Sequence, residues 1–230
     1  MNTHSQLPPA PYRLPDLRKH RGDFWAQGGD LSPESLLNAY AAGIFPWFMP
    51  GTPLQWHSPA TRCIMRPEQW KPSKSLRATL RKSGFTVRVD TAFEAVLDGC
   101  AAPRSGESGT WIGTEMREAY LTLHRQGWAH CFETWSGDRL VGGLYGLSLG
   151  RMFMGESMFS VATDASKVAW DALMRWTLAH DFAPVDGQIV NNHLLSLGAE
   201  AIPRAAYLDL LDEALQHPTL LGPWPDPPSP

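Results

Sequence analysis

The chain has 230 residues, a hydrophobic fraction of 43% and a formal net charge of −3. This length suits one main domain with a smaller partner, and the hydrophobic fraction is ordinary for a globular protein with a real core. The overall charge excludes the basic excess that runs through many nucleic-acid-binding proteins.

A first helix is well marked near the amino-terminal end. Ser32 suits the N-cap, Pro33 suits the first helical position and Gly43 suits the position just past the helix. The aromatic segment 44–48 follows directly, and Pro46 interrupts it. We therefore expect this segment to form a turn.

A local excess of positive charge follows in the region 62–88, which holds eight basic residues and one acid. Four of the basic residues belong to an expected amphipathic helix at 74–82, whose leucines fall on the opposite face. These four are Lys74, Arg77, Arg81 and Lys82. Such a cationic helix face can hold a polyanion on an otherwise acidic protein.

The rest of the chain mixes strands and helices. Alternation and capping signals predict strands at 86–89, 129–135, 140–147, 151–154 and 185–190, and helices at 92–97, 115–125 and 165–179. Thr114 and Asp164 are the expected caps of the last two helices, and 136–138 reads as a hairpin turn. Strands in a meander with helices before and after predict an α+β fold.

The termini and cysteines limit the cellular setting. Both ends are proline-rich, at 8–15 and 218–230, and are expected to be extended arms or frayed tails. The three cysteines, Cys63, Cys100 and Cys131, show neither a disulfide framework nor zinc spacing. No secretion signal and no apolar run near the ~20 residues that cross a bilayer occur. We expect a cytoplasmic protein with no metal and no membrane contact.

One carboxylate, Glu156, lies inside the apolar segment 153–160. A buried acid must be paired or hydrogen-bonded, because its desolvation is otherwise costly. A structural glutamate satisfies that condition as well as a functional one does. Both interpretations stay open at this point.

A second polar segment, 185–193, alternates so that Asp186 and Gln188 point to one face of a strand. A carboxylate and a carboxamide side by side can orient and deprotonate an amine, although a polar edge of a sheet gives the same pattern. His193 fits a helix start better than a catalytic role. No phosphate-binding loop, dinucleotide-binding motif or metal-ligand spacing is present.

Seven segments, taken in order, closely resemble the leucyl/phenylalanyl-tRNA–protein transferases. They are 28–33; Tyr40 with 43–48; Trp56 with 58–59; 109–112; 142–146; 155–160 with 165–167; and Asp186-x-Gln188 with 196–199 and 202–204. Each segment alone is weakly specific. Seven in register, over roughly residues 25–210, are strongly specific.

The resemblance implies a small N-terminal domain, 1–61, joined to an acetyltransferase-like (GNAT-like) catalytic domain, 62–230, in which helices flank a mixed sheet. The active site is expected at their junction. The implied reaction moves Leu, Phe or Met from aminoacyl-tRNA to the N-terminal Arg or Lys of an acceptor protein, which marks that protein for N-end rule degradation. A monomer without a cofactor is expected, since the donor is already an activated ester.

The resemblance also implies roles for particular residues. Asp186 accepts a proton or orients the amine through Gln188, and Glu156 fixes the reacting group. The donor side chain is expected in a cleft of Leu144, Phe153 and Met158, with Trp47 and Trp111 near the terminal adenosine. The helix with Lys74, Arg77, Arg81 and Lys82 is expected to hold tRNA phosphates without reading sequence.

Two other functions remain to be separated from this one. An acyl-CoA N-acetyltransferase needs the pattern R/Q-x-x-G-x-G/A, but the partial matches at Arg81 and Arg139 end in Thr86 and Leu144. A non-catalytic tRNA- or degron-binding module predicts binding without transfer.

Overall fold

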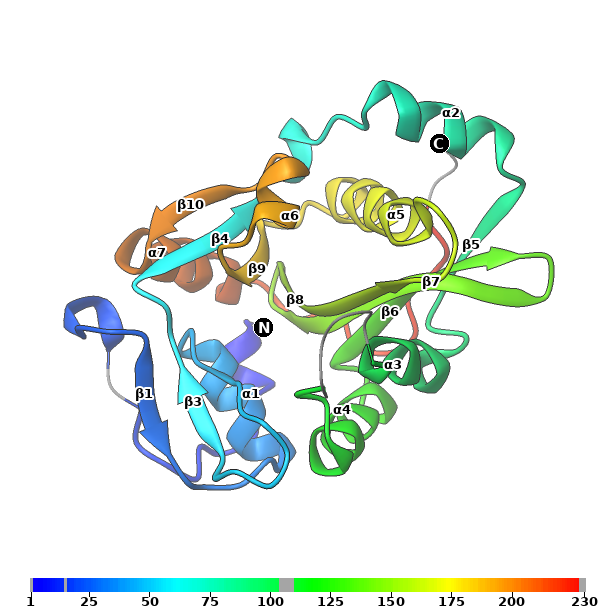
Figure 1. Ribbon diagram of the computed structural model, residues 1–230. Coiled ribbons are helices and arrows are strands. Elements are labelled where there is room, and N and C mark those ends of the chain that lie inside the picture. Colours follow the sequence, from blue (N-terminus) through cyan, green and yellow to red (C-terminus); the bar gives the residue numbers. More distant parts are fainter. Residues whose placement is uncertain (1, 15, 104–109, 228–230) are drawn as a thin grey trace.

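Two sheets organise the protein in the computed structural model, which describes residues 2–14, 16–103 and 110–227 (Figure 1). The small sheet has the strand order β1-β3-β2, with β1 (Phe24–Gln27), β2 (Phe45–Pro46) and β3 (Gln55–His57). The large sheet has seven strands among the described residues, in the order β10-β4-β9-β8-β7-β6-β5. They are β4 (Thr61–Met65), β5 (Phe85–Val89), β6 (Ala129–Ser136), β7 (Arg139–Leu149), β8 (Met152–Ser160), β9 (Val185–Ile189) and β10 (Glu200–Pro203).

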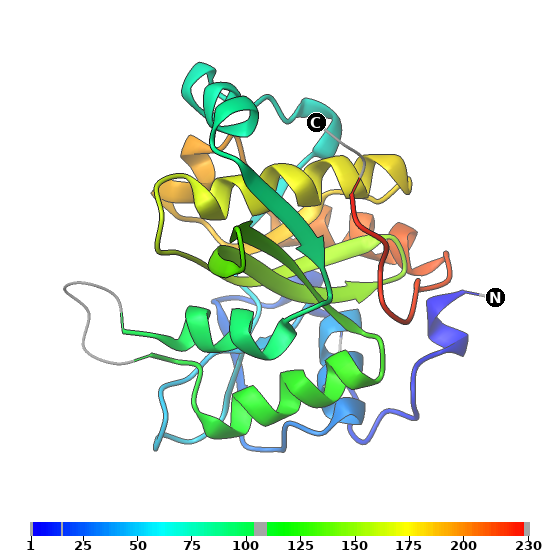
Figure 2. The ribbon, with the colours of Figure 1, turned by 90° about the vertical axis from the view of Figure 1, so that its right-hand side faces the viewer.

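Helices cover both faces of the large sheet (Figure 2). One face packs against α5 (Ala165–Ala179), and the opposite face packs against α3 (Phe93–Ala101) and α4 (Thr114–Arg125). The other helices are α1 (Pro33–Ala41), α2 (Lys74–Lys82), α6 (Asn192–Ser196) and α7 (Arg204–Leu215), with short 3₁₀ turns at Thr3–Ser5, Leu17–Lys19 and Pro67–Gln69. The expected mixed sheet flanked by helices, with an N-terminal unit beside it, is confirmed.

Strands β5 to β8 form the expected antiparallel meander, and β9 then joins β8 in parallel. The 136–138 hairpin is confirmed, with Gly137 at φ +58°. Strand β8 runs to Ser160, six residues past the predicted end, so Glu156 lies within a strand. The sequence did not indicate β4 or β10, because the strands with which they pair are distant along the chain.

Helix α1 begins and ends as predicted. The Ser32 hydroxyl accepts a hydrogen bond from the Ser35 amide at 3.2 Å, and Gly43 follows the helix at φ +75°. The turn predicted at 44–48 is wrong in part, because Phe45 and Pro46 form strand β2. Since β2 lies at the edge of its sheet, a proline without an amide hydrogen is tolerated there.

One predicted helix cap is wrong, and another is correct in position only. Thr114 is the first residue of α4, and Gly113 occupies the N-cap position. Asp164 does precede α5, but at φ +63° its carboxylate makes no cap bond. It binds Lys167 and Thr79 instead, at 2.8 and 3.1 Å.

Both proline-rich ends are bound to the body of the protein where the structure describes them. The Thr3 amide donates to the His217 carbonyl oxygen at 3.0 Å, so the two ends meet. Further on, the Trp224 amide donates to Asp90 at 2.9 Å and its indole is buried. The C-terminal segment is therefore a strap rather than a frayed tail. No helix in the described ranges is long and apolar enough to span a bilayer.

Candidate functional site

A cavity of about 830 Å³ opens where β8 and β9 part. The two parallel strands are in register at one pair, Met154 and Asp186. The next residues of both strands, from Gly155 and from Gly187, line the cavity, and β2 and the end of α3 close it from the other side. Ligands of sheets with parallel strands commonly bind beyond the carboxyl ends of those strands, where neighbouring strands diverge.

The five residues expected to bind the donor all line this cavity. They are Trp47, Trp111, Leu144, Phe153 and Met158. Leu144 and Phe153 are buried in its wall, whereas Trp47 is 46% exposed at the rim. Gly109 of the 109–112 motif lies outside the described residues.

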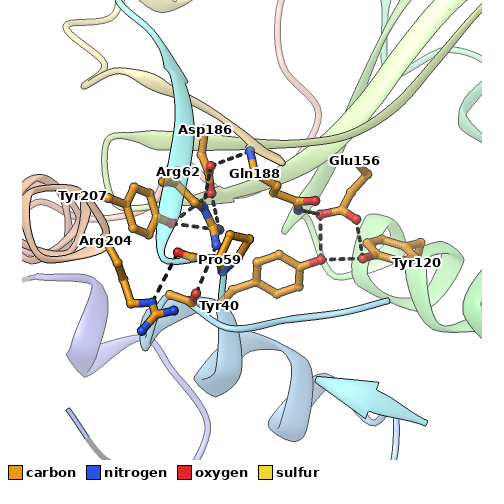
Figure 3. Close-up of polar contacts among 10 residues, drawn as sticks. Tyr40, Pro59, Arg62, Tyr120, Glu156, Asp186, Gln188, Arg204 and Tyr207 are labelled. Carbon is orange, nitrogen blue, oxygen red and sulfur yellow. Dashed lines mark hydrogen bonds and ion pairs between the residues drawn. The ribbon is translucent and has the colours of Figure 1, made fainter. Parts of the chain in front are cut away.

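Glu156 lies on the floor of the cavity, inside a cluster of hydrogen bonds (Figure 3). Its Oε1 accepts from Tyr40 at 2.6 Å and from Gln188 Nε2 at 2.7 Å, and its Oε2 forms a hydrogen bond with the Tyr120 hydroxyl at 2.8 Å. Burial raises the pKa of Glu156 to about 7, although its three hydrogen bonds oppose that rise. Sequence reasoning gave no role to Tyr40 or Tyr120, which come from α1 and α4.

Asp186 does not line the cavity, and its side chain is fully buried. Arg62 donates to both of its oxygens, through Nε at 2.8 Å and Nη2 at 2.5 Å. Tyr207 and the Gln188 amide donate as well, at 2.9 and 2.8 Å. The carboxylate is thus balanced by one cation and saturated with donors (Figure 3).

Arg62 is itself enclosed by aromatic rings. Its guanidinium carbon lies 4.8 Å from the Phe45 ring centre and 4.3 Å from the Tyr207 ring centre, and Nη1 donates to the Gly43 carbonyl at 3.2 Å. Arg62 belongs to the basic stretch 62–88, yet it is inaccessible to a polyanion. Nothing local in the sequence indicated this pairing, because 124 residues separate Arg62 from Asp186.

Gln188 joins these two groups. Its amide donates to Asp186 and its side chain to Glu156. The expected strand alternation is interrupted, since Cys63 and Ile64 of β4 pair with Gln188 and Asp186 and leave Gly187 as an extra residue. Gln188 adopts φ +60°, a left-handed conformation that is costly for a residue with a Cβ. The bulge sets the carboxamide at the cavity wall.

The predicted cationic helix exists as α2, and its four basic residues are exposed. None of them forms an ion pair within the part of the chain that the structure describes. Thr79 of α2 bonds to Asp164, just before α5, and Ser166 of α5 lines the cavity. Helix α2 is therefore attached at the start of α5, the helix whose Ser166 lines the cavity.

Metal-ligand geometry does not occur among the described residues, where no three His, Cys, Asp or Glu side chains are close enough to hold an ion. All three cysteines are buried, and no disulfide joins any two of them. His193 lies in the first turn of α6, for which Asn191 supplies the N-cap, as expected.

The chain matches known proteins over most of its length. The sequence profile of a family described as leucyl/phenylalanyl-tRNA protein transferase matches residues 64–212, and the profile of its N-terminal domain matches 29–60. A leucyl/phenylalanyl-tRNA–protein transferase of Desulfatibacillum aliphaticivorans is 50% identical over 213 residues, which are 92% of this chain and 91% of the relative. Its counterpart in Xanthomonas axonopodis pv. citri (strain 306) is 47% identical over 219 residues, 95% and 86% of the two chains.

Among solved structures, a functionally unknown conserved protein from Staphylococcus epidermidis ATCC 12228 matches with a TM-score of 0.42 at 9% identity. The matched region covers 78% of this chain and 68% of the Staphylococcus epidermidis chain. A likeness of this size identifies no fold family.

Proposed function

Because this chain belongs to the leucyl/phenylalanyl-tRNA–protein transferase family, we propose that its cavity is where an aminoacyl group passes from tRNA to the N-terminus of a protein. The chain is an aminoacyltransferase by membership of that family. The observation that supports this use of the cavity is that aromatic, apolar and polar residues from segments as distant along the chain as Phe45 and Leu194 converge there. The acceptors are proteins with N-terminal Arg or Lys, and transfer marks them for N-end rule degradation.

The donor is Leu, Phe or Met esterified to tRNA, with its side chain against Leu144, Phe153 and Met158. Trp47 and Trp111 also line the cavity, and their indole rings suit stacking on the terminal adenosine. A pocket of this kind selects by shape, and each methyl-sized misfit is worth roughly 1–3 kcal/mol. Discrimination against Ile and Val is therefore moderate.

The chemistry is aminolysis of an ester. The acceptor nitrogen forms a bond to the donor carbonyl carbon, the bond to the ribose oxygen breaks, and one amine proton ends on that oxygen. An α-amine has a pKa near ~8, so about 1.4 kcal/mol suffices to present it unprotonated at neutral pH. No cofactor is required for these steps.

Gln188 is the group that orients the amine. Its Nε2 is committed to Glu156, which leaves Oε1 to accept a hydrogen bond from the incoming nitrogen. Asp186 acts through Gln188, since it holds the Gln188 amide and does not reach the cavity. Of the two roles expected for Asp186, the geometry supports orientation over proton transfer.

Replacement of Gln188 by alanine is expected to lower kcat about a hundredfold, the scale of misplacing a reacting group. The assay supplies radiolabelled Leu-tRNA and an Arg-initiated peptide to purified protein. Gln216→Ala, at an exposed position, is the matched control. Wild-type protein that binds both substrates without transfer would identify a binding module, and activity with acyl-CoA alone would identify an acetyltransferase.

The exposed face of α2 binds the phosphates of the tRNA. Reversal of Lys74, Arg77 and Arg81 to Glu should weaken tRNA binding and flatten its salt dependence, by about 0.9 in log–log slope for each phosphate that α2 no longer neutralises. Lys82 continues the same face. Filter binding between low and moderate salt measures both quantities.

The control for this reversal makes the same change of charge elsewhere, at the exposed residues Arg13, Lys19 and Arg125. An equal drop in affinity in both triple variants would show that net charge matters rather than the position of α2.

The finer features of the fold belong to the same proposal. An antiparallel meander, a crossing helix α5 and a parallel strand β9 support an acetyltransferase-like (GNAT-like) domain over 62–230, with a small domain over 1–61. We propose that the protein is a monomer in the cytoplasm, where aminoacyl-tRNA is available.

A further inference from the structure

Three oxygen-bearing groups meet at the floor of the cavity and contact one another in pairs. Tyr40 Oη lies 2.6 Å from Glu156 Oε1, Tyr120 Oη lies 2.8 Å from Glu156 Oε2, and the two tyrosine oxygens lie 2.5 Å apart. Each distance is within the range of an O–H···O hydrogen bond, and the last is at its short limit. Together they form a closed triangle with three edges.

Each edge of that triangle needs one hydrogen atom, and each tyrosine supplies one. If Glu156 is ionised, only two hydrogens are present. One edge then brings two oxygens together with no hydrogen between them, whichever way the hydroxyls turn. A protonated Glu156 supplies the third hydrogen and satisfies every edge.

The position of that hydrogen follows from a fourth contact. Gln188 Nε2 donates to Glu156 Oε1, which also accepts from Tyr40. Oε2 is then the oxygen that carries the hydrogen. It donates to Tyr120, Tyr120 donates to Tyr40, and Tyr40 donates back to Oε1.

We infer that Glu156 is protonated in the resting protein, and that Tyr40 and Tyr120 hold its proton in a closed ring of three hydrogen bonds. The role of this ring in transfer rests on the proposed function, whereas the protonation of Glu156 does not. In transfer, the ring is a rigid, neutral support that fixes the carboxamide of Gln188. Tyr40 and Tyr120 are positioning residues for Gln188, and Glu156 is not the base that accepts the amine proton.

The surroundings of Glu156 agree with a neutral carboxyl. Burial is the larger cause that raises its pKa, and the charge of Asp186 of β9 adds to the rise. Tyr145 of β7 is a further electrostatic neighbour of Glu156. Arg62 is engaged by Asp186 and does not reach Glu156. Burial also holds the pKa of Tyr40 and Tyr120 well above the ordinary value, so both hydroxyls keep their hydrogens.

Infrared difference spectroscopy tests the proton directly. The spectrum of wild type minus Glu156→Gln at pH 6 should contain the carbonyl band of a protonated carboxyl group. A carboxylate band in its place would overturn the inference. This measurement needs no transfer reaction, so failure of the transfer assay leaves it unaffected.

Unfolding equilibria test the same proton through its linkage to pH. Glu156 ordinarily titrates near 4.5, and the folded protein raises this pKa to about 7. Between these values the folded chain keeps a proton that the unfolded chain has lost, so wild type loses stability as pH rises. Relative to Glu156→Gln, its unfolding constant should rise about tenfold per pH unit in that window and level off on either side. A ratio that does not change with pH would contradict a protonated Glu156.

Transfer rates separate a support from a base. Glutamine resembles a protonated glutamate, because its amide can donate to Tyr120 while its carbonyl accepts from Tyr40 and Gln188. Glu156→Gln should therefore retain at least about tenfold more kcat than Glu156→Ala or Glu156→Asp, on the scale of a misplaced reacting group. Equal losses in all three variants would favour an ionised base.

The role of the two tyrosines is tested by measuring kcat and KM separately. Tyr40→Phe and Tyr120→Phe each remove one ring hydroxyl and should lower kcat with little change in the KM for the donor. Tyr12→Phe, on an exposed tyrosine, is the control. A rise in the donor KM with kcat unchanged would place the two hydroxyls in substrate binding and overturn their role as supports.

Discussion

Replacement of Asp186 by alanine should destabilise the protein by about 3–5 kcal/mol, because it leaves Arg62 as an unpaired charge in the interior. The Arg62 side chain is 1% exposed and cannot reach water where it lies. Tyr207 and the Gln188 amide lose an acceptor at the same time. Urea unfolding measures the change as a lower midpoint with a similar slope.

The double variant Arg62→Met with Asp186→Leu supplies the contrast. Apolar residues of similar volume often replace a buried ion pair at little cost, so the double variant should be more stable than Asp186→Ala. Asp98→Ala is the surface control. It removes a partner of Arg117 at a position that is 55% exposed and should cost about 0–1 kcal/mol. Equal destabilisation by Asp98→Ala and Asp186→Ala would refute the argument from burial.

Activity adds a second measurement to the Asp186 variants. In the proposed arrangement, Asp186 fixes the bulge that presents Gln188, so a folded double variant should transfer slowly at every pH. A rate that recovers at high pH would instead identify Asp186 as the general base, because hydroxide would then remove the amine proton in its place.

Trp224→Ala should destabilise the protein by about 3–5 kcal/mol, the usual cost of removing a large buried aromatic side chain. The indole is stacked between His130 and Trp176, with ring centres 3.7 Å from each, and Trp176 stacks in turn on His180 at 3.9 Å. Trp224 is the point where the C-terminal strap enters the core. Its removal leaves a cavity and releases the strap.

Trp47→Ala is the matched control for this variant, because Trp47 is 46% exposed and should change stability by less than about 0.5 kcal/mol. The two variants are expected to separate an effect on stability from an effect on donor binding. Trp224→Ala should keep its transfer rate per folded molecule, whereas Trp47→Ala should lose affinity for the aminoacyl donor. Thermal unfolding together with single-turnover transfer distinguishes them, and a stable Trp224→Ala protein would mean that the strap is only loosely held.

Local sequence signals predicted the elements whose stability is decided by near neighbours. Helices α1 and α2 are nine residues long and carry their apolar stripes within that length with the cap residues next to it, and both were located correctly. The β6–β7 hairpin was located because its turn chemistry is contiguous. The predicted end of β8 was too early, since the polar and small residues after Met154 belong to a strand only in the presence of β7.

The sequence by itself determined the α+β class, the cationic helix and some of the residues that line the cavity, because periodicity, capping and motif spacing are properties of adjacent residues. Tertiary structure alone decided what those residues do to one another. Arg62 meets Asp186, and Tyr40 and Tyr120 meet Glu156, across separations of 36 to 124 residues. Burial then turns one acid into half of an ion pair and the other into a neutral carboxyl, since the protonation of a buried group depends on the partners that folding brings to it.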